Sequence, residues 1–108
     1  MPDNTEEISA PRSSSRSRDV RSRSKLIFGN ADRLQVANAV ARSSSGVVHA
    51  QELSERLGIS PPRVRAQLLA FVEAELMTLL PRHGLTQDYE RRDDPFWPAV
   101  RSVYEHWE

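Results

Sequence analysis

Apolar residues recur every three or four positions in several stretches of the chain, the spacing that gives a helix one buried face. One stretch follows Asn30 and ends at the polar run "SSSG" of residues 43–46. A second runs through "HAQELSERLG" (49–58), a third starts directly after Ser60, and the last covers "DPFWPAVRSVYEHWE" (94–108). The pattern predicts four helices, and the pair Val47 and Val48 predicts a short edge strand between the first two.

Two of these helices are separated by a very short turn, "GIS" (58–60). Gly58 stands where a helix end favours a left-handed residue, and Ser60 is a residue type that caps helix starts. Pro61 suits the first helical position because its missing N–H would have no partner there. The apolar positions of the second helix are Val64, Leu68 and Phe71. This arrangement predicts a helix-turn-helix.

The outward residues of the second helix have side chains suited to DNA. Arginine pairs bidentately with guanine, glutamine with adenine, and small apolar side chains contact a thymine methyl. A recognition helix that enters the major groove presents such residues in its first turns. We therefore predict DNA contacts by Ser60, Pro62, Arg63, Arg65, Ala66 and Gln67. The alternative is that the two arginines only solvate a helix face.

A β-hairpin is predicted after the second helix of this pair, in "MTLLPRHGLTQDYERRDD" (77–94). Thr78 and Leu80 lie on one side of the turn-forming "HGLTQD" and Tyr89 lies on the other, while Pro81 restricts its strand to an edge. We predict that Arg82 and His83 reach a flanking minor groove or the DNA backbone. Three further polar residues of the segment are candidates for the same role, namely Gln87, Arg91 and Arg92.

The segment "AQELSERLGISPPRVRAQLLAFVEAELMTLLPR" (50–82) resembles the winged helix-turn-helix core of bacterial arsenic-repressor-like and multiple-antibiotic-resistance-repressor-like regulators. The resemblance covers about residues 30–92 and implies a mainly α fold with a small β-hairpin, to which this chain adds a C-terminal helix. Glu75 stands where these families usually have glycine, so we expect the recognition helix to run on or to end without a left-handed cap. Leu69 and Val72 are apolar on a face expected to point outward.

Residues 1–25 differ in composition from the rest, because Ser and Arg alternate around a single aliphatic residue, Val20, in residues 11–25. Such a segment buries too little apolar surface to offset its ordering entropy, so we predict a disordered tail over 1–25 and one domain over 26–108. The tail holds six basic and four acidic residues. It is either a solubilising extension or a basic arm that contacts phosphates.

The C-terminal helix is rich in aromatic residues and contains both tryptophans of the chain. Aromatic anchors are enriched in protein interfaces, and a two-fold operator requires a two-fold protein. We predict a homodimer with an interface formed by Phe96, Trp97, Val100, Val103, Tyr104 and Trp107. The alternative is that this helix packs on its own domain.

Enzyme and metal chemistry are not indicated. The chain has no cysteine, and its three histidines are far apart in sequence, so no metal-ligand spacing is present. We predict no catalytic residue, no cofactor and no metal. No run reaches the ~18 apolar residues of a membrane span, and we expect a cytoplasmic protein without membrane contact.

These patterns together predict a sequence-specific DNA-binding transcriptional regulator, a repressor, with double-stranded DNA as partner. The formal net charge is zero, although nucleic-acid binding depends on phosphate neutralisation. A different function therefore stays open: a winged-helix protein-interaction module, an adaptor or anti-repressor without specific DNA binding.

Overall fold

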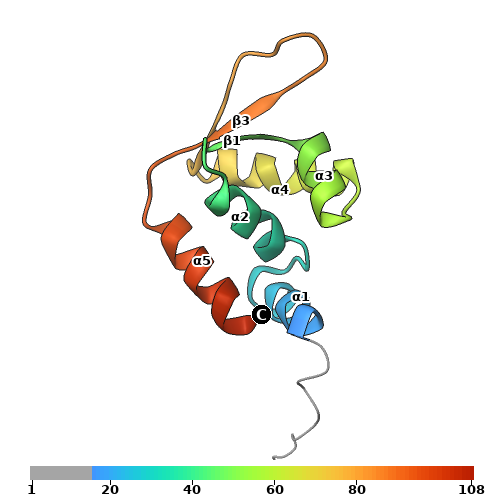
Figure 1. Cartoon of the computed structure of the whole chain (residues 1–108), viewed down its shortest axis with the longest axis vertical. Coiled ribbons are helices and arrows are strands. Elements are labelled where there is room, and N and C mark those ends of the chain that lie inside the picture. The colour runs from blue at the N-terminus through green and yellow to red at the C-terminus, as the bar shows by residue number, and fades with distance from the viewer. Residues whose placement is uncertain (1–15) are drawn as a thin grey trace, which may run out of the picture.

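The computed structural model describes residues 16–108, and within them one helix lies at the centre of the others (Figure 1). This central helix, α2, contacts each of the other four helices. The helices are α1 (Arg16–Phe28), α2 (Arg33–Arg42), α3 (Ala50–Leu57), α4 (Pro61–Glu73) and α5 (Phe96–Trp107), and the strands are β1 (Val47–His49), β2 (Met77–Leu79) and β3 (Asp88–Arg91). In Figure 1, α1 and α5 lie at one end of the molecule and the β2–β3 hairpin at the other.

The predicted helix-turn-helix is confirmed in α3 and α4. Gly58 ends α3 with φ +70°, and its N–H donates to the Ser54 carbonyl at 2.9 Å. Ile59 then packs into the core. The Ser60 side chain makes no capping hydrogen bond, and Pro62 at the second helical position lacks one of the two N–H groups that a capping serine accepts from. The proline at the first helical position therefore contributes more to this helix start than the serine cap does.

The predicted hairpin and edge strand join into one antiparallel sheet of order β1-β3-β2. Tyr89, in the central strand, pairs with Val48 of β1 and with Leu79 of β2, and its side chain is buried. The long connection between β2 and β3 closes at its tip through a bridge between His83 and Thr86. The hairpin thus projects from the helices while its base is anchored in the core.

The predicted boundary of the tail is wrong for residues 16–25, which belong to α1. Val20 is only 1% exposed, and the Ser24 side chain is buried as well. The Ser24 hydroxyl donates to the Asn30 carbonyl at 2.6 Å and accepts from the Leu34 N–H at 3.1 Å. A buried valine and a hydrogen-bonded serine help to dock α1, and composition does not reveal that. Residues 1–15 of the predicted tail lie outside the described residues.

Helix α4 ends in a left-handed cap although the residue there is not glycine. Glu75 has φ +66°, and it is the one non-glycine residue with positive φ among residues 16–108. The Leu76 N–H donates to the Phe71 carbonyl at 2.8 Å and the Glu75 N–H to the Val72 carbonyl at 3.0 Å, the two bonds of a Schellman motif. The expectation that the helix runs on or lacks such a cap is therefore wrong.

Glu75→Gly is expected to raise the free energy of unfolding by about 1 kcal/mol, because glycine adopts the left-handed conformation without the steric cost that a Cβ brings. Thermal and urea unfolding followed by circular dichroism measure the difference. The matched control is Glu73→Gly, which places glycine at a helical position and should lower stability by roughly 0.5–1 kcal/mol. Destabilisation by both substitutions would contradict this account of the cap.

Candidate nucleic-acid interface

The start of α4 presents most, but not all, of the predicted DNA-contacting residues to solvent. The exposed ones are Ser60, Pro62, Arg63, Arg65 and Ala66. Gln67 is 2% exposed, and its Oε1 accepts a hydrogen bond from Arg33 Nε at 2.7 Å. Position 67 follows Val64 by three residues and therefore shares the buried stripe of the helix. The prediction of a base contact by Gln67 is corrected: this side chain fastens α4 to α2.

Arg63 is exposed but already has a protein partner. Its Nε donates to Asp32 Oδ2 at 2.9 Å and its NH2 to Asp32 Oδ1 at 2.7 Å. Arg21 of α1 donates to the same Oδ1 at 2.9 Å. The Arg63 hydrogen bonds hold the pKa of Asp32 below its usual value although burial opposes this, and Asp32 in turn raises the pKa of Arg63. Two of the N–H donors of the Arg63 guanidinium are therefore already hydrogen-bonded within the protein.

Arg65 lies instead on a groove between α4, the start of α3 and the hairpin. The groove has a volume of about 410 Å³. Its walls are formed by His49, Ala50, Gln51, Arg65, Arg82, Leu85, Thr86, Gln87 and Tyr89. Burial raises the pKa of the Tyr89 hydroxyl, and the positive charges of Arg65 and Arg82 partly offset that rise. The structure therefore brings together two predicted cations, one from the helix and one from the hairpin.

The other polar residues of the hairpin have different surroundings. His83 is exposed and its Nε2 lies 3.0 Å from Asp88 Oδ2, so its polar contact is within the hairpin. Arg91 is turned inward, and its NH1 donates to the carbonyls of Val40, Ala41 and Ser43 at 2.8–3.0 Å. Arg91 is thus a cap for the end of α2, and its candidacy for a DNA contact is withdrawn.

Three groove residues were missed by the sequence reasoning: His49, Gln51 and Thr86. His49 precedes α3, and its Nδ1 accepts from the Glu52 N–H at 3.4 Å. Gln51 and Thr86 are 35 positions apart in the sequence, and only the docking of the hairpin beside α3 places them on one surface. No local pattern signals such a pairing.

The predicted dimer residues of α5 lie mostly inside the protomer. Trp97 and Val100 are buried, and the Trp97 ring meets Phe71 and Phe96 edge-on at centroid distances of 5.5 and 4.9 Å. Phe96, Tyr104 and Trp107 are half-buried against the same core, and Arg23 of α1 covers the Trp107 ring. Val103 is the predicted dimer residue that stays exposed, at 38%. The prediction that Trp97 and Val100 belong to a dimer interface is therefore corrected: both side chains pack in the core of one protomer.

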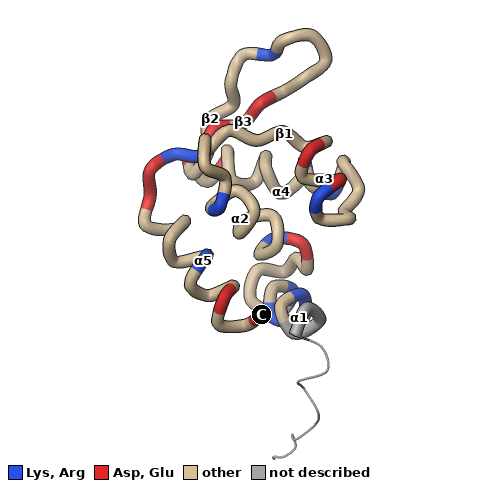
Figure 2. Tube along the Cα trace, viewed as in Figure 1, with Lys and Arg blue, Asp and Glu red and all other residues tan. Residues whose placement is uncertain are grey.

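Basic and acidic residues both occur at the two ends of the molecule. Figure 2 marks Lys and Arg in blue and Asp and Glu in red on the Cα trace, and both colours appear at the hairpin end and at the end formed by α1 and α5. Among residues 16–108, no group of three or more His, Asp or Glu side chains is placed to share a metal ion. None of the helices in this part of the chain is long and apolar enough to span a membrane.

No protein-family model matches the chain, and no curated protein matches it. Among solved structures it is similar to AntR, an antimony-specific transcriptional repressor, with a TM-score of 0.53 and 26% sequence identity over 75% of this chain and 67% of that one. The chain has the winged helix-turn-helix fold of transcriptional regulators. In this winged helix-turn-helix, α4 is the helix that follows the turn, and the β2–β3 hairpin is the wing.

Acid is expected to destabilise the protein through Asp32. Its folded-state pKa is lowered, so its contribution to stability is complete above the unfolded value of about 3.9 and is lost as the pH falls through the folded value. Asp32→Asn should therefore melt at a lower temperature than the wild type at pH 7, with a gap that narrows below about pH 4. Melts of the exposed Asp93→Asn control should follow the wild type at both pH values. A gap for Asp32→Asn that is independent of pH would contradict the assignment.

Proposed function

We propose that this winged helix-turn-helix protein is a sequence-specific DNA-binding repressor of transcription that reads the major groove with α4. The observation that carries the proposal is the groove where Arg65 of α4 and Arg82 of the wing lie on one surface. The likeness to a transcriptional repressor supports it. In this proposal the protein acts by occupying its DNA site in the cytoplasm, with no catalytic residue and no cofactor.

Arg65 is the residue that we propose to read a base. Its side chain is exposed in the second turn of α4 and makes no hydrogen bond or ion pair within residues 16–108. Its guanidinium is therefore available to guanine O6 and N7. Ala66 and Pro62, exposed beside it, offer apolar surface to a thymine methyl. We assign phosphate contacts to Ser60, Arg82 and His83, which are exposed; such contacts fix the register without reading sequence.

Arg63 has a different task in this proposal. Because Asp32 already binds two of its donors, its remaining N–H groups suit a phosphate better than the bidentate pairing that guanine requires. The carboxylate also aims the guanidinium and fixes α4 against α2. We therefore assign Arg63 a positioning role and a phosphate contact.

The antimony specificity of AntR does not extend to this chain with the fold. AntR is antimony-specific, whereas this chain has no cysteine, so soft thiolate ligands are not available to it. We propose that any signal to which this chain responds is recognised by other chemistry.

Arg65→Ala should cost roughly 1–3 kcal/mol of discrimination between the preferred duplex and a scrambled duplex. The preferred duplex is obtained by selection with the wild-type protein from a random-sequence library, and affinities are measured at two salt concentrations. Arg63→Ala should instead weaken both duplexes about equally, lower the salt slope by about one unit, and lower the melting temperature.

The matched control is Arg101→Ala, an exposed arginine on α5 away from the groove, which should bind both duplexes as the wild type does. If selection enriches no sequence, or if Arg65→Ala binds both duplexes normally, the proposed function fails.

The alternative of a protein-interaction module is favoured by two exposed apolar side chains. Leu69 on α4 is 50% exposed, and Leu85 near the tip of the wing is almost fully exposed. Val72, which was grouped with Leu69 as outward-facing, packs partly against the core. Failure of the duplex selection by a protein that melts cooperatively would favour this alternative.

We also propose that the protein binds its site as a homodimer through the end of the molecule formed by α1 and α5. Besides Val103, Leu26 and Ile27 at the end of α1 are exposed, and the two helices contact each other. Exposed apolar side chains at one end of a small domain mark an interaction surface. A dimer would present two copies of α4 to a two-fold operator.

Val103→Glu is expected to convert the dimer to a monomer, because it places a charge on the apolar seam without disturbing the protomer core. Sedimentation velocity at several protein concentrations measures the change. Ser102→Glu, the adjacent exposed residue on α5, serves as the matched control and should stay dimeric. A wild-type protein that sediments as a monomer at all concentrations would end the homodimer proposal.

A further inference from the structure

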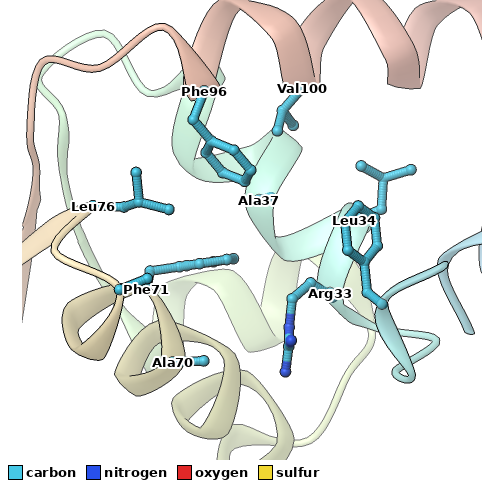
Figure 3. A pocket seen from close by; sticks show the side chains of 10 residues that line it. Arg33, Leu34, Ala37, Ala70, Phe71, Leu76, Phe96 and Val100 are labelled. Atoms are coloured by element: carbon cyan, nitrogen blue, oxygen red, sulfur yellow. The ribbon is translucent and has the colours of Figure 1, made fainter.

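A pocket of about 170 Å³ lies between α2, α4 and α5, beside the last turn of α1. Figure 3 shows the side chains of Phe71 and Leu76 on one side and those of Phe96 and Val100 above them, all directed toward the same space. Leu34 and Ala37 of α2 complete the wall, together with Ala70 and Ala74 of α4. The pocket is separate from the groove that contains Arg65.

The walls of this pocket present carbon almost throughout. Phe71 and Phe96 stand at a centroid distance of 6.3 Å, tilted to each other, so ring surfaces border the space. Arg33 is the charged residue of the lining; its Nε donates to Gln67 Oε1, and Figure 3 shows its side chain directed toward α4 and away from Phe96 and Val100. Polar cavities bind water, whereas apolar cavities of about 150 Å³ stay dry and accept a benzene-sized molecule.

The pocket also has an opening. Phe28, at the end of α1, is 39% exposed, and Ala74, after the last turn of α4, is exposed too. Because both residues belong to the lining, the pocket reaches the surface where α1 and α4 end. A small molecule therefore has a route in that does not require the core to unfold.

We propose that this pocket binds a small uncharged apolar molecule of about the size of one aromatic ring. Its volume suits one ring, and its walls offer carbon contacts. A charged ligand would lose its hydration there without gaining hydrogen bonds of equal strength from the walls. The site goes beyond the proposed function, because binding to it requires no DNA. An occupant would touch Ala70 and Phe71, which belong to the same helix as Arg65.

The test uses benzene and benzoate as probes on the full chain. Benzene should shift the methyl resonances of Leu34 and Val100 saturably, and at ten times its dissociation constant it should raise the melting temperature by several degrees. Benzoate, with the same ring and a charge, should bind at least tenfold more weakly. Benzoate binding as tight as benzene, or no saturable shift with benzene, would overturn the proposal.

Ala70→Leu fills the pocket from the α4 side and should abolish the benzene shift. The matched control Ala99→Leu makes the same change at an exposed α5 position outside the lining and should keep it. If Ala70→Leu does not fold, the smaller Ala70→Val should weaken benzene binding. If the filled variant binds benzene as tightly as the wild type, the assignment is overturned. It is also overturned if benzene changes the sedimentation coefficient, because the pocket would then be covered by a second copy of the chain.

Discussion

The carboxylate of Asp32 joins three helices where the central helix begins. Asp32 occupies the N-cap position of α2, although its side chain makes no capping hydrogen bond there. It accepts hydrogen bonds from Arg63 of α4 and from Arg21 of α1. A buried carboxylate is costly unless it is paired, and both arginines favour its charged form, Arg63 more strongly than Arg21. Since α2 contacts every other helix, this one charge fixes the helix of the proposed interface and the N-terminal helix relative to the same core.

A chain of zero net charge still offers a basic groove, because Arg65 and Arg82 lie in its walls and no acidic residue among residues 16–108 does. Arg21 and Arg63 pair with Asp32, Arg33 with Gln67, and Arg91 with three backbone carbonyls. Their charges are partly neutralised or turned away from solvent, while Arg65 and Arg82 remain beside the groove. Local arrangement rather than net charge sets the potential that a DNA phosphate would meet.

Sequence reasoning succeeded where the determining interactions are local. The turn at Gly58, the proline start of α4 and the hairpin around Tyr89 each follow from residues a few positions apart, and all are present. It failed at the non-glycine cap of Glu75 and where a side chain depends on a partner in another element. Nothing near Gln67 indicates that Arg33 binds it, and nothing in the Ser/Arg-rich segment indicates that Ser24 docks on the residues after it through hydrogen bonds. The sequence therefore predicted which elements form the candidate site, but not every residue in it.

Arg91 links the base of the wing directly to the end of the central helix. Its guanidinium spans from β3 to the carbonyls of Val40 and Ala41 in the last turn of α2 and of Ser43 just after it. A tilt of α2 would break these bonds or move the base of the wing with it. Because α2 also packs on α5, the base of the wing and the C-terminal helix are held by the same central helix.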